Sequence, residues 1–170
     1  YHLVNLLGHM AASLLLFGCV YQTCRLKNQS PGIKKDAAVI ACAVALLWSV
    51  HPVHTQAVTY IIQRAESLAG MFYLLTFYAA ICFFVTHRRE WRLLSLLTCL
   101  LGGLMKEILV TAPIAIFLYD RLFISGSFRR AWEKNKVLYL GFLVPWAVML
   151  MLYLTAHPET VPSEGFALKG

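Results

Sequence analysis

A series of long, mostly apolar runs constrains the fold of this chain more than any other feature. They cover residues 3–24, 37–53, 68–85, 93–105, 108–120 and 137–155. The first, third and last are long enough, at 1.5 Å per residue, to cross roughly 30 Å of hydrocarbon as helices. Soluble domains contain few runs of this length, and 59% of the residues here are hydrophobic while 14% are charged. We therefore predict an all-α integral membrane protein.

The fourth and fifth runs decide how many times the chain crosses. They form either one long tilted span or the two short arms of a hairpin. The hairpin places all but Arg64, Lys106 and Lys169 of the 15 Lys and Arg residues on one side. Short cytoplasmic loops carry an excess of Lys and Arg, so the hairpin is favoured. We predict about six transmembrane helices, with residues 1–170 forming part of one polytopic membrane domain, and the +7 net charge indicates topology, not a nucleic-acid partner.

This topology gathers the unusual polar residues on the opposite, extracytoplasmic side. Residues 55–67 place their apolar side chains at helical spacing, which predicts an amphipathic outer helix lying in the membrane interface. A plain juxtamembrane helix explains the same pattern, with Arg64 reaching out to the lipid headgroups.

Lys106 and Glu107 stand at the apex of the predicted hairpin. Each arm offers only about 12–13 apolar residues, roughly 20 Å of helix, against roughly 30 Å of hydrocarbon. The apex should therefore lie below the outer surface, where an ionisable residue indicates a functional site. The alternative is that the two side chains neutralise each other and hold the hairpin together.

Histidines occur on the same side. His51, which precedes a proline, ends the second run, and His54 follows it. No carboxylate or thiolate set completes a metal site with them, so we predict no cofactor, and a divalent metal has no support. His2, Asn5 and His9 form one stripe that should face the bundle, and both interhelical hydrogen bonding and ligand contact explain it.

Three stretches carry a family resemblance. YHLVNLLGH, HPVHTQAVTYIIQRAES and KEILVTAPIAIFLYD, in this order, resemble the membrane half of the transmembrane and tetratricopeptide-repeat O-mannosyltransferases, most closely the bacterial relatives. The family pattern often has Glu where this chain has Gln56, so an acidic role there does not carry over. The resemblance implies a type-C glycosyltransferase fold, of which this chain would be a fragment. The catalytic carboxylate is then expected upstream of Tyr1, and the tetratricopeptide repeats are expected downstream.

The resemblance also implies an activity and a place. Such an enzyme moves a sugar, a hexose such as mannose, from a polyprenyl-phosphate carrier to a protein hydroxyl on the extracytoplasmic side. Its partners would be the lipid-linked sugar, an acceptor protein and the bilayer. The expected location is the bacterial inner membrane, or the endoplasmic reticulum membrane in a eukaryote.

Arg64 and Lys106 are the residues that we expect to bind the donor phosphate. Cations held in a water-poor cavity stabilise the charge of a leaving phosphate better than cations in bulk water. Other polar residues are expected to support them: His51, His54, Gln63, Glu66, Glu107, His2, Asn5 and His9.

Three other functions are compatible with part of the pattern. Intramembrane charges also occur in a transporter or flippase of a lipid-linked or anionic substrate. A structural membrane anchor for a tetratricopeptide-repeat interaction protein explains the apolar runs alone. A haem protein would need histidine pairs on facing helices, which the predicted runs do not supply.

Overall fold

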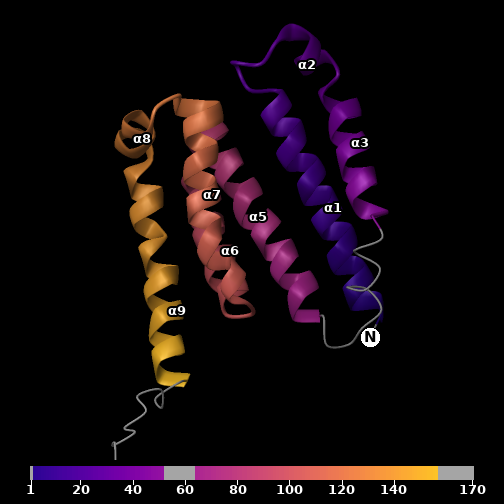
Figure 1. Cartoon of the computed structure of the whole chain (residues 1–170). Helices are drawn as coiled ribbons and strands as arrows, with labels where there is room; N and C mark the ends of the chain where they lie inside the picture. The colour runs from indigo at the N-terminus through magenta and orange to yellow at the C-terminus, as the bar shows by residue number, and fades with distance from the viewer. Residues whose placement is uncertain (1, 52–63, 157–170) are drawn as a thin grey trace, which may run out of the picture.

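The computed structural model describes residues 2–51 and 64–156, and within them every regular element is helical (Figure 1). The elements are α1 (His2–Cys24), α2 (Pro31–Lys35), α3 (Ala37–Ser49), α5 (Arg64–Thr86), α6 (Arg89–Gly103), the 3₁₀ helix η2 (Glu107–Thr111), α7 (Ala112–Tyr119), the π-helix η3 (Asp120–Ser125), α8 (Phe128–Gly141) and α9 (Leu143–Ala156). The predicted all-α class is confirmed.

The long helices lie side by side and alternate in direction. α5 packs against α1 on one side and α6 on the other, and α1 packs against α3. Figure 1 shows α1, α5 and α7 running toward the end that carries α2 and α8, and α3, α6 and α9 running away from it. The basic loops predicted to share one side therefore share one end of the bundle. We call it the basic end.

Within residues 2–51 and 64–156, four stretches are long and apolar enough to cross a membrane. They are Asn5–Cys24, Glu66–Thr86, Glu107–Ser125 and Phe128–Thr155. Ala37–Ser49 is apolar but shorter. The first turn of α6 contains three charged residues, Arg89, Glu90 and Arg92, which shortens its apolar part. The number of crossings stays a prediction.

The chain turns between α6 and η2, where the hairpin was predicted. α6 ends at Gly103 and η2 begins at Glu107. A side chain at Gly102 would place its Cβ 2.7 Å from the Phe72 Cβ and against Leu109. Only glycine fits there without a shift, and it lets the returning arm and α5 approach α6 closely.

Polar pairs join α5 to α6 inside the bundle. The Thr76 and Thr98 hydroxyls lie 3.0 Å apart, and Ser95 Oγ donates to the Thr76 carbonyl at 2.9 Å. All three residues are buried. Small hydroxyl residues permit close packing and hydrogen bond across membrane helices, so they fix how these two helices meet.

A buried carboxylate organises the basic end. Asp120, at the start of η3, is 0% exposed. It accepts hydrogen bonds from Ser125 Oγ at 2.6 Å, from Asn135 Nδ2 at 2.7 Å and from the Tyr139 hydroxyl. Because Asn135 and Tyr139 belong to α8, these bonds attach that helix to the end of the third candidate span.

Candidate functional site

A cavity of about 470 Å³ opens among the helices near the end opposite the basic loops. It is lined by Trp48, Glu66, Ala69, Gly70, Tyr73, Leu74, Lys106, Ile108 and Thr111. The lining comes from α3, the first turns of α5, the α6–η2 turn and η2. Its volume and mostly apolar wall, with a few polar groups, are typical of small-molecule sites.

One face of α5 forms much of the wall. Glu66, Gly70 and Tyr73 follow one another at four and three positions, so the helical repeat stacks them on one side. A Cβ at Gly70 would meet nothing within 4 Å. The wall is therefore open at its middle and carries a carboxylate near the start of the helix.

The turn after α6 places Lys106 at the cavity. The Lys106 N–H donates to the Gly102 carbonyl at 3.0 Å, and the Lys106 backbone is extended, with φ −156° and ψ 140°. Lys106 Nζ donates to Glu66 Oε1, which joins residues 40 positions apart. An ammonium group has three donors, and Glu66 occupies one. The remaining donors suit an anionic ligand.

The Lys106–Glu66 ion pair contributes little to the stability of the folded protein. The Lys106 and Glu66 side chains are 41% and 49% exposed. A pair that is this exposed contributes at most about 1 kcal/mol, because water screens the charges and both side chains lose conformational freedom. The other ion pair within the described residues, Arg129–Glu133, joins neighbours on a single helix. Lys106–Glu66 instead joins the turn to α5 at a cavity.

The structure brings two of the predicted site residues together and separates a third. Lys106 pairs with Glu66, whereas Glu107 lines a different cavity of about 720 Å³ with Trp146 and Met149. Successive side chains point to opposite sides of an extended backbone, so Lys106 and Glu107 diverge. The alternative that Lys106 is neutralised by its neighbour Glu107 is not what the structure shows.

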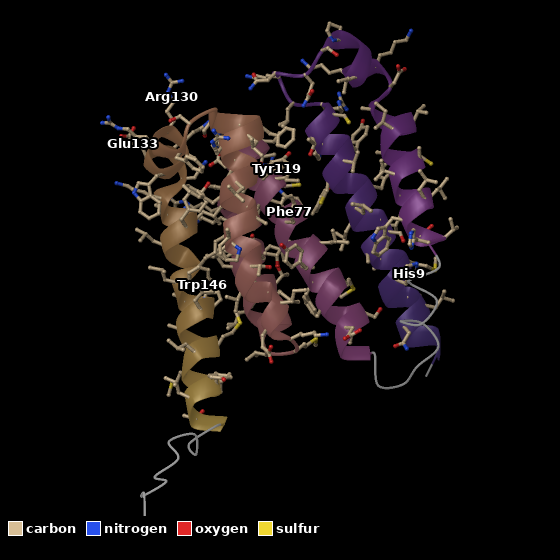
Figure 2. All side chains as sticks on the ribbon, in the orientation of Figure 1. His9, Phe77, Tyr119, Arg130, Glu133 and Trp146 are labelled. Carbon is tan, nitrogen blue, oxygen red and sulfur yellow. The ribbon has the colours of Figure 1, made fainter. Side chains whose placement is uncertain are left out.

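His9 joins two helices behind the cavity wall. Its Nε2 donates to the Ser49 carbonyl at 3.0 Å, and its ring stacks on Trp48 with centroids 5.0 Å apart. Figure 2 shows His9 between α1 and α3. Trp48 lines the cavity, so His9 positions a wall residue, which favours the interhelical explanation for this residue. On the same helix, Asn5 is buried.

The remaining predicted residues are placed only in part. His51 follows α3 and is exposed. His54, Gln63 and most of the predicted outer helix 55–67 lie outside the described residues. His2 and Arg64 are the first residues of α1 and α5, and the structure describes their backbone alone. The roles expected for these residues stay predictions.

Sequence reasoning missed three wall residues: Trp48, Tyr73 and Thr111. Tyr73 lies seven positions after Glu66, so extending the helical repeat from that carboxylate would have found it. Trp48 and Thr111 come from other elements and carry no comparable pattern. Within the described part of the chain, no group of three or more His, Cys, Asp or Glu side chains could hold a metal ion.

Known proteins supply an independent comparison. No family model and no solved structure matches the chain. Protein O-mannosyl-transferase TMTC4 of mouse is 31% identical over 156 residues, covering 80% of this chain and 20% of the relative. Mouse TMTC1 is 33% identical over 71% of this chain and 13% of its own length. Drosophila Tmtc1 is 32% identical over 94% of this chain and 19% of its own length.

The chain therefore spans about a fifth of the length of these curated relatives, or less. Each carries the name protein O-mannosyl-transferase, and the similarity covers 71% or more of this chain in all three. On this similarity, the chain belongs to the family of TMTC protein O-mannosyl-transferases.

Proposed function

We propose that this chain is part of the membrane domain of a type-C glycosyltransferase. The enzyme would move a hexose, such as mannose, from a polyprenyl-phosphate carrier to a protein hydroxyl. The observation that carries the proposal is Lys106, which Glu66 holds at the wall of a partly aromatic cavity. The names of the relatives, protein O-mannosyl-transferases, support the choice of sugar and acceptor.

Lys106 would act on the leaving group. The acceptor oxygen attacks the anomeric carbon, the bond from that carbon to the phosphate oxygen breaks, and the phosphate keeps the electron pair. A cation about 4 Å away stabilises a unit charge by about 1 kcal/mol in bulk water but about 4 kcal/mol at the effective dielectric near a protein. Lys106 would therefore lower the barrier by binding the phosphate more tightly as its charge grows.

Other residues complete this proposed site. Glu66 orients the Lys106 ammonium, and Arg64, the first residue of α5, is the second proposed phosphate ligand. Trp48 and Tyr73 offer aromatic faces to the sugar or the isoprenoid chain. The acceptor proton would go to a carboxylate that we place upstream of Tyr1, and tetratricopeptide repeats would follow this chain.

We place the Lys106 end of the bundle on the extracytoplasmic side. The basic end carries the Lys and Arg excess typical of cytoplasmic loops. Six crossings then bring the Lys106 turn to the opposite face. The membrane is the bacterial inner membrane, or the endoplasmic reticulum membrane in a eukaryote.

Sealed proteoliposomes that contain the full-length protein test this proposal. Single cysteines introduced at Asn28 and Thr155, in a background free of native cysteines, report the orientation. Both positions are exposed. Asn28 lies in the loop between α1 and α2 and Thr155 in the last turn of α9, and Figure 1 shows this loop and this helix end at opposite ends of the bundle. Labelled polyprenyl-phosphate mannose and an acceptor protein are supplied from one side at a time. We expect label on the acceptor only from the side on which the Thr155 cysteine reacts.

Two outcomes would contradict the proposal. Label that crosses the bilayer without reaching the acceptor would support the transporter or flippase. Transfer from the Asn28 side would show that the site faces the basic end.

A further inference from the structure

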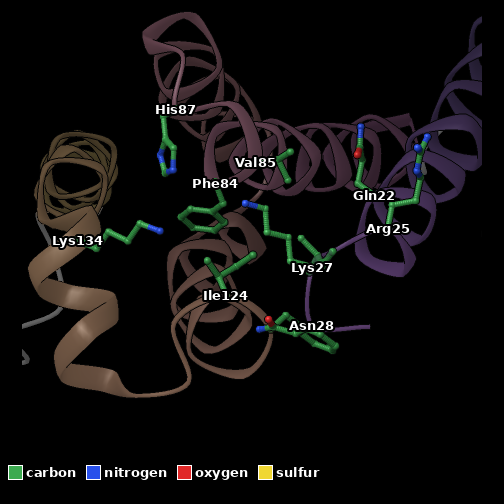
Figure 3. Close-up of a pocket in the computed structure, with 11 residues that line it drawn as sticks. Gln22, Arg25, Lys27, Asn28, Phe84, Val85, His87, Ile124 and Lys134 are labelled. Atoms are coloured by element: carbon green, nitrogen blue, oxygen red, sulfur yellow. The ribbon is translucent and has the colours of Figure 1, made fainter. Parts of the chain in front are cut away.

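A second cavity, of about 380 Å³, is drawn in Figure 3. It lies at the basic end, and the turn after α6 lies at the opposite end of the bundle (Figure 1). Its lining includes three cations, Arg25, Lys27 and Lys134, together with His87. They come from different parts of the chain: the loop after α1, the residue after α5, and α8. Figure 3 shows Lys27, Lys134 and His87 directed toward the space beside Phe84. The fold therefore brings together, around one cavity, cations that lie far apart in the sequence.

This positive charge has little local compensation. None of the described residues that line the cavity is a carboxylate, and the two ion pairs found in the same part of the chain involve none of its cations. Arg25 stacks on the Tyr21 ring and donates to the Tyr21 hydroxyl at 2.7 Å. The ends of α1 and α5 contribute a partial negative charge of roughly −0.5 each. An excess of positive charge remains, and it favours an anion.

The cavity lies where the apolar helices end. Three of the four candidate spans end at Cys24, Thr86 and Ser125, beside its lining. Phe84, Val85 and Ile124 form an apolar side next to the cations. In a membrane this level is the boundary between acyl chains and headgroups, so the cavity offers both a cationic and an apolar surface to one lipid.

His87 has an unusual backbone conformation at this place. It follows the last residue of α5 with φ 54°, in the left-handed region. Glycine is the common residue there because any Cβ adds strain. The chain instead places an imidazole at the cavity, with its ring nearly perpendicular to the Phe83 ring and the two centroids 6.1 Å apart. A side chain that is kept at a strained backbone position indicates that the side chain itself has a role there.

We propose that this cavity binds the phosphate of an anionic phospholipid from the leaflet that faces the basic end. Lys27 and Lys134 would bind the phosphate, and Phe84, Val85 and Ile124 would pack against the first part of the acyl chains. The inference is independent of the proposed transfer reaction, because it concerns the other end of the bundle and needs no sugar donor.

Binding of short-chain lipids to the full-length protein in a neutral detergent tests this inference. Dioctanoyl phosphatidylglycerol is compared with dioctanoyl phosphatidylcholine and with inorganic phosphate, by native mass spectrometry. We expect phosphatidylglycerol to bind at least about fivefold more tightly than either of the others. Lys27→Gln and Lys134→Gln should each weaken its binding by about fivefold, the effect of one cation near a lipid headgroup.

Arg130→Gln is the matched control, because Arg130 is exposed at the same end but does not line the cavity (Figure 2). It should change binding by less than about twofold. Equal losses in all three variants would show a diffuse charge effect and overturn the site. If phosphatidylcholine binds as tightly as phosphatidylglycerol, the cavity does not select anionic lipids and the proposal is wrong. If inorganic phosphate binds as tightly, the cavity is a free-phosphate site and not a lipid site.

Discussion

Replacing Lys106 with methionine is expected to reduce sugar transfer at least about a hundredfold at saturating donor. Loss of one preorganised donor to a developing oxyanion costs about that much in known enzymes. Methionine keeps the length and apolar stem of lysine but removes the ammonium that Glu66 holds at the cavity. The initial rate of label transfer to the acceptor protein measures the effect, and equilibrium binding of the donor lipid should weaken with it.

A double substitution separates catalysis from charge balance. If Lys106 merely neutralises Glu66, Lys106→Met with Glu66→Gln should restore transfer, because replacing both members of a pair can be neutral. We expect the double variant to insert and unfold like the unmodified protein yet stay inactive. The matched control removes the ion pair at the other end, Arg129→Gln with Glu133→Gln, and should retain transfer. Activity of the Lys106 double variant would make Lys106 a structural residue.

Replacing Asp120 with alanine is expected to lower the free energy of unfolding by about 3 kcal/mol or more. The carboxylate is fully buried, and its loss leaves donors on Ser125, Asn135 and Tyr139 without their acceptor. Each unsatisfied buried donor costs about 1–3 kcal/mol, part of which the structure recovers by relaxing. Denaturant unfolding in detergent, followed by tryptophan fluorescence, measures the change.

Asp36→Ala provides the control for Asp120. Asp36 precedes α3, is exposed and makes no side-chain capping hydrogen bond. Its loss should change the free energy of unfolding by less than about 0.5 kcal/mol. Asp120→Asn, which retains one acceptor oxygen, should lose less than Asp120→Ala. Similar losses in Asp120→Ala and Asp36→Ala would show that the buried hydrogen bonds do not attach α8.

The lengths of the apolar runs predict the positions of the helices that are apolar along most of their length. The runs 3–24 and 68–85 lie within α1 (His2–Cys24) and α5 (Arg64–Thr86). The last run, 137–155, covers the end of α8 and nearly all of α9, but α8 begins earlier, at Phe128. Its first half is polar, and its attachment depends on Asp120, a contact between elements that periodicity along one segment cannot predict.

The candidate site was predictable as a set of residue types but not as a geometry. Lys106 and Glu66 were both expected near the donor, yet Glu107 is adjacent in sequence and was the obvious partner for Lys106. Backbone conformation decides otherwise: an extended Lys106 turns its side chain toward α5, where Glu66 lies. Likewise, Lys27 and Lys134 indicated only which loops share a side, because the sequence does not show that they meet in one cavity.

Photocrosslinking tests the claim that the cavity between α3, α5 and η2 binds the sugar donor. A polyprenyl-phosphate mannose analogue with a diazirine next to the phosphate is added to the full-length protein, irradiated and mapped by peptide mass spectrometry. We predict adducts at Trp48, Tyr73 and Thr111, which line the cavity, and their loss in Lys106→Met. Adducts spread along the exposed face of α9, or gathered near Lys27 and Lys134, would contradict the claim.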